Sequence, residues 1–179
     1  MASLVVRRAR KSDGQGFLGL LTALANFEKL EPPDEETKRR ILQDIFSRRR
    51  LGLFVALTAA EVVGYALYFY SYSSFLGRPT LYLEDIFVSD EYRGKGIGAS
   101  LFRRCAKEAL SEGCGRMEWS VLTWNHNAIG FYENVGARRL DEWYVYRLDR
   151  SQLRGVASGR RVGPSARHGK LEQGPSGQR

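Results

Sequence analysis

A glycine-rich segment in the middle of the chain has the clearest chemical potential. Residues 93–99 read Arg-Gly-Lys-Gly-Ile-Gly-Ala and lie between the apolar run 81–88 and a segment of helical periodicity. Glycines at alternate positions let backbone N–H groups converge on an anion, and the N-terminus of a following helix adds partial positive charge. Arg93 and Lys95 add formal charge, which a merely flexible turn would not require. The segment therefore predicts a phosphate or pyrophosphate site, although it lacks the Gly-Lys-Ser/Thr ending of nucleoside triphosphate loops.

Two groups of acidic residues could attract or deprotonate a cation. Glu84 and Asp85 are adjacent within the apolar run 81–88, and Glu28 follows Phe27 at the end of an amphipathic segment. Carboxylates can bind a cationic group or accept a proton from it. Neighbouring residues of a regular strand point to opposite faces, so only one of Glu84 and Asp85 faces a given ligand unless a bulge intervenes. For Glu28, a solvated helix end is an equally good interpretation.

Tyr132 and Asn125 each allow two interpretations. A phenol such as that of Tyr132 can protonate a leaving group. Phe131-Tyr132 on an apolar helix face also fits ordinary core packing, which the residues alone favour. Asn125 precedes a helical pattern, where it can cap the helix, contact a ligand or do both.

The segments around these residues predict an α/β domain with a mixed, twisted sheet of about seven strands and about four helices. A capping box at Ser12–Gln15 is expected to begin the first helix, Asp34 to cap the second, and glycines to end the third and fourth at Gly113 and Gly136. The expected strands cover residues 4–8, 53–57, 62–72, 81–88, 117–122, 138–140 and 143–148.

The basic surplus is concentrated at the C-terminal end. The whole chain has 179 residues and a formal net charge of +8, but residues 151–179 hold six Lys or Arg and only one Glu. Gly, Ser, Arg and Pro dominate there, so we expect a folded domain over residues 1–150 and a basic, disordered tail over 151–179. A nucleic-acid partner is disfavoured, because the tail lacks the interleaved aromatic residues that stack on bases.

Other features of the whole chain favour a reduced, cytoplasmic compartment. No apolar run approaches the roughly 18–20 residues needed to cross a membrane, and the N-terminus lacks the pattern of an export signal. If Cys105 and Cys114 lie on one helix, they are too far apart to form a disulfide. The two histidines are isolated from the cysteines, so we expect no metal site.

With these residues in view, the sequence resembles the GNAT N-acetyltransferase superfamily. Residues 93–98 fit the R/Q-x-x-G-x-G/A loop that holds acetyl-CoA in that superfamily, and the order of elements fits its fold across residues 3–149. Three blocks, at residues 25–30, 82–88 and 124–133, resemble the spermidine/spermine (diamine) and thialysine N-acetyltransferases.

The resemblance implies a role for each candidate residue. Tyr132 corresponds to the general acid and Glu84 to the group that deprotonates the substrate, directly or through water. Phe27, Glu28, Glu84 and Asp85 correspond to residues that bind a small cationic amine. The implied acetyl-CoA contacts are Ile86, Phe87, Val88, Arg93, Gly94, Lys95, Gly96, Ile97, Gly98, Ala99 and Asn125. A homodimer is also implied.

The chain departs from the polyamine-specific members at Ser73–Gly77. Those members carry an acidic residue and a Trp just before the glycine, where this chain has Ser73-Ser74-Phe75-Leu76-Gly77. The loss favours an amino-acid-like acceptor such as thialysine, or a short diamine. Direct transfer in a ternary complex is expected, because neither cysteine lies in a candidate catalytic motif. The alternatives are acetylation of a protein lysine or N-terminus, and nucleic-acid binding through the tail.

Overall fold

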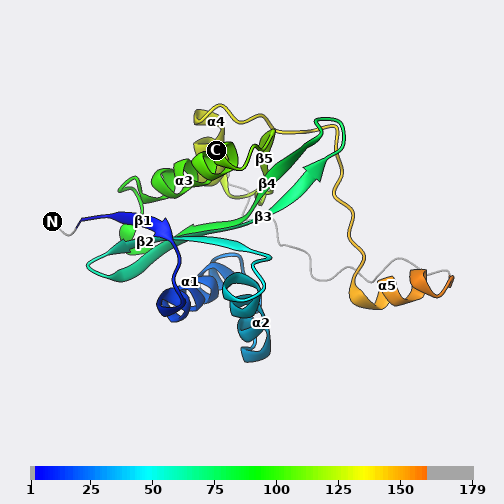
Figure 1. Cartoon of the computed structure of the whole chain (residues 1–179), viewed down its shortest axis with the longest axis horizontal. Coiled ribbons are helices and arrows are strands. Elements are labelled where there is room, and N and C mark those ends of the chain that lie inside the picture. The colour runs from blue at the N-terminus through cyan, green and yellow to red at the C-terminus, as the bar shows by residue number, and fades with distance from the viewer. Residues whose placement is uncertain (1–2, 161–179) are drawn as a thin grey trace, which may run out of the picture. The chain divides into compact units, whose positions relative to one another are not determined.

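The computed structural model describes residues 3–160, which fall into two compact units that meet in sequence at Ser120 and Val121. The first unit contains a five-stranded sheet in the order β1-β2-β3-β4-β5, with three helices of three or more turns around it (Figure 1). Its elements are β1 (Val5–Arg8), η1 (Lys11–Asp13), α1 (Gly14–Phe27), α2 (Glu35–Phe46), β2 (Gly52–Thr58), β3 (Glu61–Ser73), β4 (Arg78–Val88), η2 (Asp90–Tyr92), α3 (Ile97–Ser111) and β5 (Arg116–Trp119).

The sheet is covered on both faces because its strands alternate between two apolar clusters. Leu53, Val55 and Leu57 of β2 join the cluster beneath α1 and α2, whereas Phe54 and Ala56 join the cluster beneath α3. Figure 1 shows α1 and α2 on one side of the strands and α3 on the other. This three-layer arrangement is the mixed α/β fold that the sequence predicts.

A β-bulge changes the phase of β4. Leu67 of β3 pairs with Asp85 and Tyr68 pairs with Leu83, so Glu84 has no partner opposite it. Before the bulge, Leu81 and Leu83 pack in the cluster beneath α3; after it, Phe87 packs in the cluster beneath α1 and α2. The extra residue therefore shifts the alternation of β4 by one position, so that the side chains after Glu84 lie on the face opposite to the one that a regular strand would give them.

The helix starts agree with the sequence in one case and differ in another. Asp34 caps α2 as expected, since its Oδ1 accepts the Thr37 backbone N–H at 2.7 Å. The prediction of a capping box at Ser12–Gln15 is wrong, because α1 begins after Asp13 without a side-chain cap. The Asp13 carboxylate instead accepts the Arg10 backbone N–H and pairs with Arg7 at 2.7 Å. Arg7 holds the pKa of the buried Asp13 carboxyl below its ordinary value.

The second unit contains two helices, α4 (His126–Asn134) and α5 (Arg150–Ala157). The expected strands 138–140 and 143–148 are not formed within residues 3–160, so the sheet has five strands rather than about seven. Part of the expected disordered tail is helical, because the Asp149 carboxylate and the Gln152 side chain form a capping box that begins α5. Residues 161–179 of the tail lie outside the described residues.

A buried carboxylate fixes α3 to the sheet. Glu108 is 4% exposed, accepts the Tyr68 hydroxyl at 3.0 Å and pairs with Arg8 and Arg104. The Tyr68 ring, stacked on Phe54, lies so close to Gly52 that a Cβ there would be 2.1 Å from its Cζ. Gly52 is therefore required for this packing, since any side chain would displace the ring from Glu108.

Replacing Gly52 by alanine is expected to destabilise the fold by about 1–3 kcal/mol, because the buried Tyr68 ring must move. Urea denaturation measures the change. The matched control is Gly19→Ala in α1, where a Cβ would meet nothing within 4 Å. This control is expected to gain about 0.5–1 kcal/mol from helix propensity. Equal unfolding midpoints for the two variants would contradict the packing role of Gly52.

Candidate active site

The bulge brings Asp85 to the face of the sheet that α1 covers. Its cross-strand partner, Leu67, packs in the cluster beneath α1 and α2, and residues opposite each other share a face. Glu28 follows the last residue of α1 and Tyr65 lies on the same face of β3, and both influence the ionisation of Asp85. The structure therefore brings together Glu28 and Asp85, two of the residues that the sequence proposes for binding the substrate.

Burial and like charge make Asp85 a weak acid. Desolvation raises the pKa of its carboxyl to about 7, and the charges of Glu84 and Glu28 contribute to the rise. The Tyr65 hydroxyl opposes it, although no contact of that buried hydroxyl meets full hydrogen-bond geometry. Burial also raises the pKa of Glu28. A carboxyl near pKa 7 can accept a proton from an ammonium group and release it again at neutral pH.

Glu84, the expected deprotonating group, occupies the bulge itself. Its side chain is exposed, whereas that of Asp85 is half-buried. The sequence leaves room for a bulge at Glu84 and Asp85, and the bulge in the structure gives the two carboxylates different surroundings. Of the pair, Asp85 has the environment that suits proton transfer.

The glycine-rich loop has the backbone that an anion site requires. Gly94 and Gly96 adopt positive φ of 73° and 76°, which glycine reaches without strain. Gly96 begins α3 without a side-chain cap, and the first turn of α3 contains no acidic residue. The first N–H groups of the helix therefore remain available to a phosphate, and the partial positive charge of the helix end is not neutralised.

One edge of β4 is unpaired beside this loop. The parallel ladder between β4 and β5 ends at Leu83 and Trp119, whereas β4 continues to Val88. Ile86, Phe87 and Val88 pair with β3 on their other side. Arg93 Nε donates to the Val88 carbonyl oxygen at 3.1 Å, and no strand within residues 3–160 pairs with this edge, so its remaining backbone groups can bind an extended ligand as an added strand would.

Asn125 and Tyr132 belong to the second unit and are described by their own surroundings. The Asn125 side chain accepts the Ala128 backbone N–H at 3.2 Å and so caps α4, one of the two interpretations that the sequence left open. Tyr132 is 9% exposed, and burial raises the pKa of its hydroxyl to about 12. A phenol with this pKa keeps its proton at neutral pH and can donate it.

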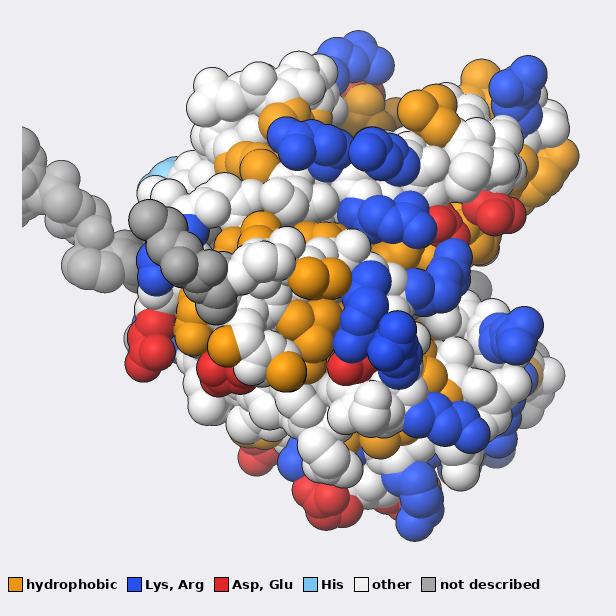
Figure 2. Space-filling view, turned by 60° about the vertical axis from the view of Figure 1, so that its left-hand side comes forward, with side chains coloured by type: hydrophobic (Ala, Val, Ile, Leu, Met, Phe, Trp, Pro, Cys, Tyr) orange, Lys and Arg blue, Asp and Glu red, His pale blue; other side chains and the backbone are white. Residues whose placement is uncertain are grey.

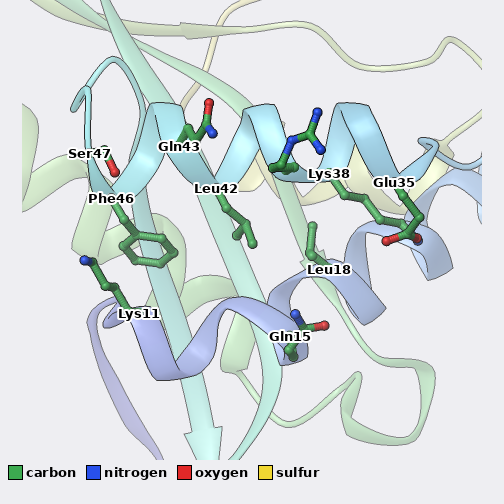
Figure 3. Close-up of a pocket in the computed structure, with 10 residues that line it drawn as sticks. Lys11, Gln15, Leu18, Glu35, Lys38, Leu42, Gln43, Phe46 and Ser47 are labelled. Carbon is green, nitrogen blue, oxygen red and sulfur yellow. The ribbon is translucent and has the colours of Figure 1, made fainter.

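Two cavities in the first unit lie away from Glu28 and Asp85, which we call the acidic pair. One, of about 390 Å³, lies between α1 and α2; Leu18, Leu42 and Phe46 form its apolar wall, and Lys38 pairs with Glu35 at its rim (Figure 3). The other, of about 430 Å³, lies where β3 extends past the start of β2. Neither contains a residue that the sequence assigns to the site, so the acidic pair rather than cavity size identifies the candidate site.

Three further observations concern surface charge, metal ligands and membrane-spanning helices. Lys and Arg side chains are spread over the face drawn in Figure 2, with fewer Asp and Glu side chains among them. Within residues 3–160, no group of three or more His, Cys, Asp or Glu side chains could hold a metal ion. In the same part of the chain, no helix is long and apolar enough to cross a membrane.

Sequence reasoning missed two features of the site. Tyr65 lies in the expected strand 62–72, and only the pairing of β3 with β4 shows that it neighbours Asp85. Arg93 was assigned to the cofactor, but its guanidinium lies 4.9 Å from the centre of the Phe27 ring and 5.2 Å from that of Phe87. Neither contact has a signal in the local sequence.

Comparison with known proteins fits this geometry. Residues 20–137 match the acetyltransferase (GNAT) family. A thialysine N-epsilon-acetyltransferase of Sus scrofa is 34% identical over 172 residues, covering 88% of this chain and 99% of the pig protein. The L-ornithine N5-acetyltransferase NATA1 of Arabidopsis thaliana is 45% identical over 100 residues, covering 56% of this chain and 44% of the plant protein.

A solved structure shares the fold. An integron cassette protein from the mobile metagenome of V. cholerae superposes with a TM-score of 0.76 at 26% identity, covering 88% of this chain and 99% of that protein. The family match extends over more than half of the sequence and includes both the acidic pair and the glycine-rich loop. The resemblance expected from the sequence is thus confirmed, and the chain is an acyltransferase that belongs to the acetyltransferase (GNAT) family.

Proposed function

We propose that this enzyme transfers an acetyl group from acetyl-CoA to a primary amine of a small cationic acceptor. The proposal rests on the acidic pair, Glu28 and Asp85. Glu28 influences the ionisation of Asp85 on the α1 face of the sheet, and Asp85 belongs to β4, the strand that leads to the glycine-rich loop. Two neighbouring carboxylates attract an ammonium group. The amino-acid acceptors in the names of the thialysine and ornithine enzymes support the same substrate class.

The residues of the loop and of β4 fit acetyl-CoA. The backbone from Gly94 to Ala99, at the uncapped start of α3, would hold the pyrophosphate, and Lys95 adds positive charge. The edge of β4 at Ile86, Phe87 and Val88, with which β5 does not pair, would accept the extended pantetheine arm, with Asn125 as a further contact. When bound, acetyl-CoA supplies a thioester whose carbonyl carbon is attacked by the amine nitrogen while the C–S bond breaks.

In the proposed mechanism, Asp85 takes the proton that the amine must lose. The acceptor arrives as an ammonium ion, which has no free electron pair and cannot attack a thioester. Asp85, with a pKa of about 7, accepts that proton more readily than an ordinary carboxylate does. Glu84, exposed at the bulge, passes protons to solvent through water, and Glu28 with Phe27 holds a second cationic group of the acceptor.

Tyr132 donates a proton to the departing thiolate, and no cysteine carries the acetyl group. Burial raises the pKa of Cys105 to about 12, and it also raises that of Cys114. Both sulfurs therefore remain thiols at neutral pH and are poor nucleophiles. The state of the two thiols supports direct transfer within a ternary complex.

The acceptor screen that tests this function compares thialysine, lysine, ornithine, putrescine, spermidine and spermine. Because Ser73–Gly77 lacks an acidic residue, we expect thialysine or ornithine to give the highest kcat/KM and spermine the lowest. The readout is release of free CoA. If no acceptor has a KM below about 1 mM, a protein amine becomes the better interpretation and the proposal fails.

Replacing Tyr132 by phenylalanine is expected to lower kcat about tenfold or more, with little change in acetyl-CoA affinity, because only the hydroxyl is lost. Steady-state kinetics and calorimetric titration with acetyl-CoA separate the two effects. Tyr72→Phe, at a side chain that is 68% exposed, is the matched control and should behave as the wild type. Unchanged kcat in Tyr132→Phe removes Tyr132 as the acid.

We also propose that the enzyme is a homodimer. The segment Trp143–Tyr146 exposes consecutive apolar side chains, among them Tyr144 at 84% and Tyr146 at 90%, and apolar surface of this kind favours an interface. Sedimentation equilibrium should give twice the 20.3 kDa chain mass for the wild type. The double variant Trp143→Ser, Val145→Ser should give a monomer. A wild-type monomer at about 10 µM, within the range of ordinary dimer affinities, contradicts the proposal.

A further inference from the structure

Arg93 occupies a position that its place in the glycine-rich loop does not explain. It follows η2 and precedes Gly94, so its backbone belongs to the loop expected to bind phosphate. Its side chain instead reaches the end of α1. The guanidinium Cζ lies 4.9 Å from the centre of the Phe27 ring and 5.2 Å from that of Phe87, and the two rings are 6.5 Å apart. The cation therefore sits in the angle between two aromatic rings.

The hydrogen bonds of Arg93 hold it in this angle. Its Nε donates to the Val88 carbonyl oxygen at 3.1 Å, and its Nη2 lies 2.8 Å from Asp90 Oδ1. Both partners lie at or just beyond the end of β4. With its donors bound there and the guanidinium against the rings, the side chain is directed at α1. The backbone N–H groups of the loop remain available to the anion.

The contact fixes the residue that precedes Glu28. Phe27 is the last residue of α1, and the chain turns immediately after Glu28, where Lys29 takes a positive φ of 57°. The position of the Glu28 carboxylate, whose charge influences the ionisation of Asp85, thus depends on how firmly the end of α1 is held against β4. Phe87 is buried in the sheet core, so Arg93 joins a core ring to the helix end.

We propose that Arg93 is a positioning residue for the acceptor site: its side chain clamps Phe27 against Phe87 and so sets the position of Glu28 relative to Asp85. This inference rests on the proposed acceptor site at those carboxylates. A lysine cannot replace the arginine, because one ammonium group lacks the planar fork that faces two rings while donating to Val88 and Asp90.

The clamp is tested first without any substrate. Hydrogen–deuterium exchange of residues 25–30 is compared in free Arg93→Gln, Arg93→Lys and the wild type. The matched control is Arg103→Gln, which removes one exposed arginine from α3. Loss of the clamp should speed exchange of this segment about threefold in both Arg93 variants and leave Arg103→Gln unchanged. Equal exchange in Arg93→Gln and Arg103→Gln overturns the proposal.

Kinetics then separate the acceptor from the cofactor. With thialysine as the probe, Arg93→Gln and Arg93→Lys should raise the KM of the amine about fivefold or more and change that of acetyl-CoA less than twofold. A rise in the KM of acetyl-CoA that equals or exceeds that of the amine assigns the side chain to the phosphate and overturns the inference. If the wild type acetylates no small amine, the proposed function fails, and the exchange comparison alone decides whether the clamp exists.

Discussion

The phase of β4 is the constraint on which the candidate site depends. A regular strand would carry residues 81, 83, 85 and 87 on one face, beneath α3. Because Glu84 is unpaired in the bulge, Asp85 and Phe87 turn instead to the face that α1 covers. The β4–β5 ladder also stops at the residue before the bulge. The ladder stops there because β5 ends at Trp119, and the extra residue accounts for the turn of Asp85 toward the face that carries α1.

The surroundings of Asp85 disfavour the charged form of its carboxyl. Burial and the charges of Glu84 and Glu28 oppose ionisation of Asp85, whose pKa of about 7 lies above the 3.8 of an ordinary Asp carboxyl. Such a group supports folding most at low pH, and its contribution falls as pH rises from about 4 to about 7. The Glu108 cluster shows the opposite arrangement, since two arginines offset the charge of that buried carboxylate. At Glu28 and Asp85, the proposed amine acceptor would supply the offsetting positive charge from solution.

Local sequence patterns predicted much of the fold. The Asp34 cap, the glycine-rich turn into α3 and the Asn125 cap depend on residues near in sequence, and the structure has them. The strands expected at 138–140 and 143–148 failed, because apolar composition cannot show whether a neighbouring strand exists to pair with. The bulge was foreseen only as a possibility, since register depends on pairing with β3. The stack of Arg93 on Phe27 joins residues 66 positions apart, beyond the reach of any local pattern.

The ionisation of Asp85 tests the central claim most directly. Carbon-13 NMR of selectively labelled aspartate, with Asp85→Asn to assign the resonance, follows its carboxyl through a pH titration with and without thialysine. The account predicts a pKa of about 7 in the free enzyme. It also predicts a fall of about one unit or more when the cationic acceptor binds, because an adjacent positive charge favours the ionised form. A carboxyl that titrates near its ordinary value and does not respond to the amine would contradict it.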